Sequence, residues 1–145
     1  LPKGARVVPI VPNAIADYKA AGRSADALMR DLHWPLDLCL LGVGSDGHAA
    51  SIFIGPDFDE AVNGPKAIRA LGVMPDPMPR DAPVPRVTLS LAAITEARAL
   101  MIAVTGEEKR KVIETAIKQG RTSTYPIGRA LAGTELPVDI HWAPT

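Results

Sequence analysis

The sequence of 145 residues lacks most of the features that mark a specialised class of protein. It has a single cysteine, Cys39, so no disulfide framework is possible, and its first residues show neither the charged nor the apolar segment of a signal peptide. We therefore expect a cytoplasmic protein. Its 16 basic and 16 acidic residues cancel, which leaves no long-range field to attract nucleic acid or an anionic membrane surface. No apolar run approaches the roughly 20 residues that cross a bilayer, so we expect no membrane partner.

What the sequence does have is a hydrophobic content of 47%, enough for the core of one domain over residues 1–145. Helical and strand-like segments alternate, because apolar residues recur at spacings of three and four in some stretches and in short continuous or alternating runs in others. This order predicts an α/β fold. Helices are predicted at 14–31, 92–98 and 107–119, strands at 36–43, 86–91, 99–104 and 138–142, and a loop region rich in proline and glycine, with short structured pieces, at 55–85.

The helix predicted at 107–119 has the clearest signals at its ends. Thr105 and Glu108 stand at the spacing of a capping box, in which each side chain satisfies a backbone N–H near the start of the helix. Gly120 is placed to end the helix. We therefore expect a helix that is capped by its own side chains.

The most informative stretch is the loop Gly42–His48, which follows a predicted buried strand and concentrates glycines, an acid and a histidine. Ligands bind at that edge of open α/β sheets. The glycines fit the dinucleotide pattern G-x-G-x-x-G, but Gly55 and Pro56 end any following helix after about two turns, whereas a dinucleotide fold needs a full crossover helix.

His48 offers a different chemistry. Its imidazole can accept and return a proton at neutral pH, and the flanking glycines allow backbone N–H groups to approach a developing oxyanion. A histidine that exchanges protons and backbone N–H groups that bind an oxyanion together suit the attack of water on an ester-like carbonyl. From the residues alone, a structural role for His48, as a helix cap or as a donor to a backbone carbonyl, is equally compatible.

Other reactive residue types are weaker candidates. Ser45 and Ser51 lie outside a G-x-S-x-G elbow and have no evident His-Asp pair to activate them, so we expect structural or substrate-contact roles. His33 and His141 lie far from the loop in sequence and form no ligand spacing, so we predict no metal. Cys39 sits in an apolar run and is expected to be a buried thiol.

Three blocks of the sequence resemble the 6-phosphogluconolactonases, which belong with the glucosamine and galactosamine 6-phosphate isomerases. Residues 41–53 (LGVGSDGHAASIF) resemble their signature loop, 86–90 (RVTLS) their arginine-initiated strand, and 104–109 (VTGEEK) a strand-to-helix turn that carries a lysine. The order and approximate spacing of the blocks also match. The resemblance implies a Rossmann-like three-layer sandwich with a mainly parallel sheet, helices on both faces, and N-terminal strands missing from these residues.

The resemblance also implies an activity and a site. The activity is hydrolysis of 6-phospho-D-glucono-1,5-lactone to 6-phosphogluconate in the oxidative pentose phosphate pathway, by a monomeric enzyme without a cofactor. His48 would be the general base that activates water, and Asp46 would set its orientation or charge. Arg86 and Lys109 would contact the phosphate or the anionic end of the substrate. The substrate-binding residues would be Gly44, Gly47, Arg86 and Lys109.

The sequence departs from the family pattern in several respects. Ala49 stands where members usually have threonine, and Ile54 where they have proline. Family chains are longer at the N-terminus, where they carry a Gly-Gly-Ser/Thr phosphate loop, so we expect these residues to supply half of the phosphate site and to be inactive alone. Two other functions stay open: a non-catalytic sugar-phosphate-binding module, and a glucosamine-6-phosphate deaminase-like isomerase. The second is disfavoured because Ala-Ala-Ser-Ile-Phe follows His48, without the Asn and Glu of the deaminases.

Overall fold

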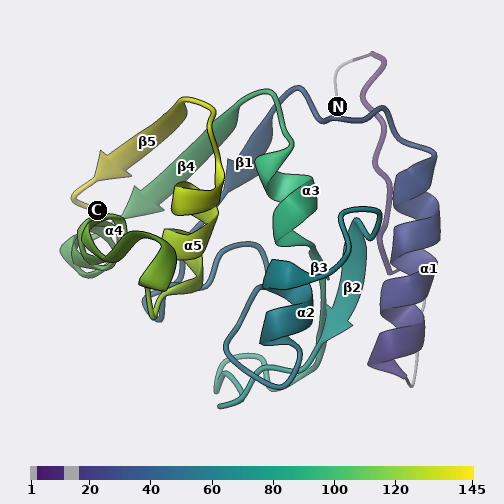
Figure 1. The fold of residues 1–145 in the computed structure, drawn as a ribbon, viewed down its shortest axis with the longest axis horizontal. Coiled ribbons are helices and arrows are strands. Elements are labelled where there is room, and N and C mark those ends of the chain that lie inside the picture. The colour runs from purple at the N-terminus through teal and green to yellow at the C-terminus, as the bar shows by residue number, and fades with distance from the viewer. Residues whose placement is uncertain (1–2, 12–16) are drawn as a thin grey trace.

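The structure, a computed structural model, describes residues 3–11 and 17–145. It contains a parallel sheet of three strands in the order β1-β4-β5 (Figure 1). The register pairs Cys39 with Leu100 and Val104 with Trp142. Because all three strands run in the same direction, their carboxyl ends lie at one edge of the sheet. The strands are β1 (Cys39–Leu41), β4 (Leu100–Thr105) and β5 (Val138–Ala143).

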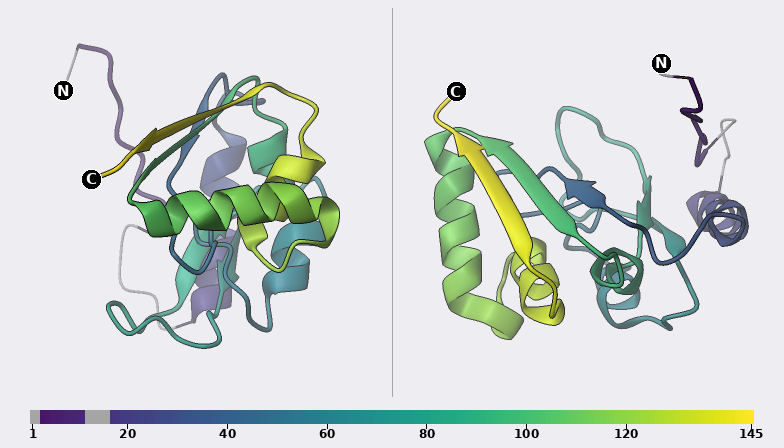
Figure 2. Two further views of the ribbon diagram at one scale, coloured as in Figure 1. Left: turned by 90° about the vertical axis from the view of Figure 1, so that its left-hand side faces the viewer. Right: turned by 90° about the horizontal axis from the view of Figure 1, so that it is seen from above.

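Helices pack against one face of this sheet (Figure 2). Alternate side chains of β4, among them Ile102 and Val104, are buried and share a core cluster with apolar residues of the helices. The intervening side chains point to the other face, as the period of a strand requires, and there Leu40 and Ala103 are exposed. The helices are α3 (Leu91–Thr95), α4 (Glu107–Gln119) and α5 (Pro126–Gly133). The expected α/β fold with a parallel sheet is confirmed.

A second sheet has two antiparallel strands, and α1 packs against it through glycines. A Cβ atom on Gly22 would lie 2.0 Å from the backbone nitrogen of Gly72, so only glycine allows the helix to come this close to the strand. The buried Asp26 accepts hydrogen bonds from the N–H groups of Arg69 (2.7 Å) and Ala70 (3.2 Å). Burial raises the pKa of Asp26, but these bonds and the one from the Arg30 guanidinium outweigh it and leave the pKa lowered. The elements are α1 (Tyr18–Arg30), β2 (Ala70–Val73) and β3 (Arg86–Leu89).

Asp57 ties α1 to the beginning of α2 (Phe58–Asn63) and to the end of β2. The Nζ atom of Lys19 lies 2.6 Å from Oδ1 of Asp57, and the N–H of Met74 donates to Oδ2 at 2.8 Å. Burial raises the pKa of Asp57, yet Lys19 and the Met74 N–H outweigh it, so the pKa is held below its usual value. The carboxylate therefore links three elements that are distant in sequence.

The helix predicted at 107–119 is confirmed at both ends, but its predicted cap is wrong. The N-cap is Gly106 with a φ of 90°, and Thr105 is the last residue of β4, so its side chain is not placed to cap the helix. Gly120 ends the helix with a φ of 60°.

Other differences concern short elements. The sequence did not predict α5, although Pro126 at its first turn was an available signal. The segment at 55–85 contains α2 and β2, and a short 3-10 helix covers Gly120–Thr122. Positions 14–16 of the first predicted helix lie outside the described residues. In the part of the chain that the structure describes, no helix has the length and apolar character needed to cross a bilayer.

Candidate active site

The loop Gly42–His48 leaves the carboxyl end of β1 and closes on itself. The N–H of Gly44 donates to the carbonyl of His48 at 3.0 Å, and the N–H of Gly47 donates to the carbonyl of Gly44 at 2.9 Å. Gly47 has a φ of +80°, and a Cβ atom there would lie 2.4 Å from the ring of Tyr125. The first turn of α5 donates an N–H to the Gly47 carbonyl at 3.0 Å. The loop is thus shaped by its glycines and supported by α5.

His48 is oriented by its contacts within this loop. Its Nδ1 atom lies 2.5 Å from Oδ1 of Asp46, and its ring stacks on Phe53 with the ring centroids 4.1 Å apart. A Cβ atom on Gly44 would lie 2.2 Å from Cε1 of His48, so the ring rests directly against the glycine backbone. When Nδ1 donates to the Asp46 carboxylate, Nε2 keeps its lone pair and can accept a proton. The side chain is 31% exposed, so water can reach it.

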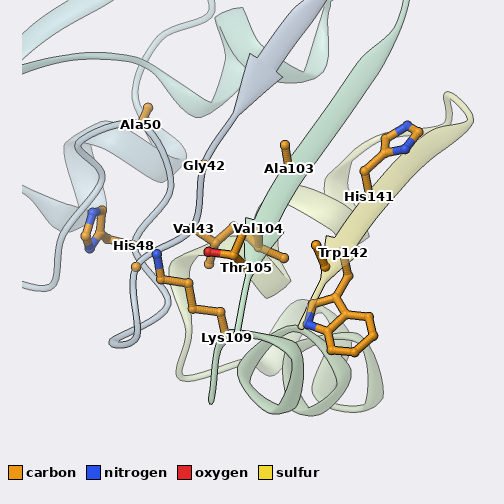
Figure 3. Close-up of a pocket in the computed structure, with 12 residues that line it drawn as sticks. Gly42, Val43, His48, Ala50, Ala103, Val104, Thr105, Lys109, His141 and Trp142 are labelled. Atoms are coloured by element: carbon orange, nitrogen blue, oxygen red, sulfur yellow. The ribbon is translucent and has the colours of Figure 1, made fainter. Parts of the chain in front are cut away.

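A cavity of about 680 Å³ opens beside the loop at the carboxyl edge of the sheet (Figure 3). Lys109 extends into it from the first turn of α4, toward the loop that carries His48. Of the described residues that line the cavity, none is acidic. A cavity with this charge and size suits a small anionic ligand. Its lining residues are Gly42, Val43, Gly44, His48, Ala50, Ala103, Val104, Thr105, Lys109, His141, Trp142 and Ala143.

The chain matches a known protein family along almost its whole length. The family model described as glucosamine-6-phosphate isomerases/6-phosphogluconolactonase matches residues 2–142. The chain belongs to this family. A 6-phosphogluconolactonase of Mesorhizobium japonicum is 38% identical over 144 residues, covering 98% of this chain and 57% of the relative. A 6-phosphogluconolactonase of Rhizobium meliloti is 32% identical over 140 residues, covering 97% and 59%. The chain therefore spans about half the length of the curated relatives it matches.

Solved structures of the family share the fold. A 6-phosphogluconolactonase from Shewanella baltica superposes with a TM-score of 0.79 at 28% identity, over 91% of this chain and 55% of that one. The enzyme from Trypanosoma brucei gives a TM-score of 0.70 at 28% identity, over 94% and 55%. A monomeric glucosamine-6-phosphate deaminase gives 0.61 at 18% identity, over 90% and 54%, and this likeness shows the fold alone.

The structure brings several of the residues predicted for the family site together. Gly44, His48 and Lys109 line the cavity. Asp46 does not line it but contacts the imidazole of His48. Gly47 also lies outside the lining, and its place in the loop is to provide the positive φ and the close approach to α5.

Arg86 lies away from the cavity lining. Its guanidinium donates to the carbonyls of Val84 (3.1 Å) and Ala82 (2.8 Å) and lies 6.0 Å from the ring centroid of Phe53. Because Phe53 stacks on His48, Arg86 reaches the loop through an aromatic ring. The substrate contact predicted for Arg86 stays a prediction.

His141 and Trp142 line the cavity, although the sequence suggested no site role for them. The parallel register places them opposite Ala103 and Val104, at the end of β4. The predicted parallel sheet could have indicated their place in the site, because the carboxyl ends of parallel strands meet at the same edge. Cys39 is buried as expected, and burial raises the pKa of its thiol, which opposes a nucleophilic role.

Proposed function

We propose that the polypeptide containing this chain is a 6-phosphogluconolactonase, which hydrolyses 6-phospho-D-glucono-1,5-lactone to 6-phosphogluconate in the oxidative pentose phosphate pathway. The observation that carries the proposal is His48, engaged at Nδ1 by Asp46, in a cavity that also holds Lys109. The names of the Mesorhizobium and Rhizobium relatives support this substrate. The proposal includes a monomeric cytoplasmic enzyme that acts on a small molecule without a cofactor.

In the proposed reaction, Nε2 of His48 accepts a proton from water while the water oxygen attacks the lactone carbonyl carbon. The tetrahedral intermediate then collapses: the bond from that carbon to the ring oxygen breaks, and His48 returns its proton to the departing oxygen. Asp46 keeps Nδ1 as the donor, so the lone pair that performs both transfers stays on Nε2. The carboxylic acid that forms ionises and releases one proton to solvent.

The structure limits the part that the two loop glycines play in this reaction. The N–H groups of Gly44 and Gly47 donate to carbonyls within the loop, so they are not available to an oxyanion. The proposed contribution of Gly44, which lines the cavity, is to bring the backbone close to the substrate and to leave room for the imidazole, and that of Gly47 is to let the loop turn close to Tyr125.

The binding end of the cavity is assigned to Lys109. Its ammonium group can form charge-assisted hydrogen bonds with the 6-phosphate. Because no acidic side chain lies among the described lining residues, the field of Lys109 in the cavity is not cancelled there. Asp46 is the acid that contacts His48, and no carboxylate lies among the described lining residues, whereas an isomerising deaminase needs further acids near this loop.

The test is proton release from fresh 6-phosphogluconolactone, corrected for spontaneous opening, with the natural full-length polypeptide that contains this chain. Ammonia release from glucosamine 6-phosphate and calorimetric binding of 6-phosphogluconate are measured in parallel. We expect faster lactone hydrolysis and no ammonia. A folded protein that does not accelerate hydrolysis would reject the proposal: ammonia release would then establish the deaminase reaction, and binding without either turnover would establish a binding module.

A further inference from the structure

Trp142 is a large aromatic residue that remains 37% exposed near the end of β5. Its indole N–H donates to the carbonyl of Gly106 at 3.0 Å. The N–H of Gly106 donates in turn to the carbonyl of Ala143 at 2.9 Å. Residues at the end of β5 therefore form hydrogen bonds with both the carbonyl and the N–H of Gly106.

Gly106 needs such support because it is conformationally free. It is the N-cap of α4, with φ 90° and ψ 150°, and a Cβ atom there would meet no other atom within 4 Å. Over the described range 17–145, no side chain caps the start of α4. The turn from β4 into α4 is consequently fixed by contacts with β5 instead of by its own side chains.

Trp142 also contacts α4 on the C-terminal side of Lys109. The guanidinium carbon of Arg110 lies 4.8 Å from the centroid of the indole, and Nε of Arg110 donates to Glu114 at 2.9 Å. Gly106 comes three residues before Lys109 and Arg110 directly follows it, so the two contacts of the indole bracket Lys109 along the chain. Lys109 and Trp142 line the same cavity (Figure 3).

We propose that Trp142 is the positioning residue for Lys109. Through the Gly106 carbonyl and the Arg110 guanidinium it fixes the first turn of α4, and this turn sets where the Lys109 ammonium group meets the anionic end of the ligand. A tilt of the turn moves the Cα and Cβ atoms from which the flexible four-carbon stem starts, so fewer conformations of the lysine bring its ammonium group to the ligand. The inference rests on the proposed function, because it takes the lactone 6-phosphate as the group that Lys109 binds.

The test is Trp142→Phe in the natural full-length polypeptide, which removes the N–H and keeps an aromatic ring beside Arg110. We expect KM for the lactone to rise by about 3- to 10-fold, the effect of losing one hydrogen bond, with kcat within about twofold of wild type. Arg110→Gln removes the other contact and is expected to change KM in the same direction. It provides a second variant that leaves the indole in place.

Trp34→Phe is the matched control. The Trp34 indole also donates to a backbone carbonyl, that of Met29, and Arg69 also lies over its ring, at 4.0 Å from the centroid. It packs in the cluster between α1 and β2, away from the cavity. We expect Trp34→Phe to leave KM unchanged.

A double-mutant cycle separates positioning from direct contact. In a Lys109→Ala background, Trp142→Phe should not raise KM further, because the residue that it positions is absent. An additive effect means that Trp142 touches the substrate as a cavity wall, which overturns the positioning role. An unchanged KM in folded Trp142→Phe overturns it as well.

Calorimetric binding of 6-phosphogluconate distinguishes the failure of this inference from the failure of the lactonase proposal. If the wild type binds this ligand but does not hydrolyse the lactone, the lactonase proposal fails. The Kd of Trp142→Phe, with the same 3- to 10-fold expectation, then decides the role of Trp142. If the wild type neither binds nor hydrolyses, both proposals are overturned.

Discussion

Replacing Gly44 by alanine tests how the glycine loop holds its histidine. The added carbon would lie 2.2 Å from Cε1 and 2.3 Å from Nδ1 of His48, and 2.7 Å from Oδ1 of Asp46. These separations are far inside van der Waals contact, so the imidazole must move. It cannot move without weakening the bond to Asp46 or the stack on Phe53. The φ of Gly44 lies outside the left-handed region, so alanine adds no backbone strain and the effect falls on His48.

We expect Gly44→Ala to lower kcat for lactone hydrolysis by about 10²-fold, because general acid–base catalysis supplies typically 10²- to 10⁴-fold. KM should change little, since Lys109 is untouched. The assay is proton release with the full-length polypeptide, with circular dichroism to verify folding. Gly133→Ala is the control: it lies outside the cavity lining, its added carbon would meet nothing closer than 3.9 Å, and most of the activity should remain. A folded Gly44→Ala with kcat within about threefold of wild type would show that the position of the imidazole against Gly44 does not control the reaction.

Three further substitutions test other contacts. Asp46→Asn replaces the acceptor that fixes Nδ1 of His48, and we expect kcat to fall by about tenfold or more in the same assay. Gly22→Ala puts a carbon 2.0 Å from the backbone of β2, and thermal unfolding should show a loss of about 1–3 kcal/mol. Asp57→Asn breaks the ion pair between the buried Asp57 and the half-exposed Lys19, and denaturant unfolding at pH 7 should show a loss of about 1–3 kcal/mol. Because the folded pKa of Asp57 is lowered, this contribution is complete above the ordinary value of about 3.9 and disappears as the pH falls through the folded pKa.

Each of these three predictions has a contrary outcome. An unchanged kcat in Asp46→Asn would mean that the carboxylate does not set the state of the histidine. For Gly22→Ala the control is Gly133→Ala, whose added carbon would meet nothing closer than 3.9 Å, and equal stability of the two would contradict the close packing of α1. For Asp57→Asn, a difference from wild type that persists undiminished to about pH 2 would show that the carboxylate charge is not its source.

The sequence predicted best the helices and strands whose formation depends on the pattern of apolar residues within the segment itself. The helix predicted from the apolar stripe Val112, Ile113, Ala116 and Ile117 runs over 107–119 as expected. The first three residues are buried, whereas Ile117 is 53% exposed. The apolar run 36–43 predicted a longer strand than β1, because Leu36 packs against the core from outside the strand and the glycine loop begins directly after Leu41. Hydrophobicity alone does not distinguish a strand from its buried flanks.

Elements that depend on distant contacts were harder to predict. The helix α5 contains glycines that weaken its propensity, and it is held by burial of Ile127 and Ala130 in the core. For the site, Asp46 and His48 are two residues apart, so their contact could be expected from the loop alone. The place of Trp142 depends on the register of β5 against β4, which no local pattern encodes.

In the proposed reaction, His48 transfers the proton in lactone hydrolysis. The most direct measurement is kcat for fresh 6-phosphogluconolactone in the full-length polypeptide carrying His48→Ala, beside His33→Ala as a control histidine that is exposed and outside the cavity. We expect a loss of about 10²-fold or more for His48→Ala and a wild-type rate for His33→Ala. A folded His48→Ala variant that keeps more than about half of the wild-type rate would contradict this role of His48.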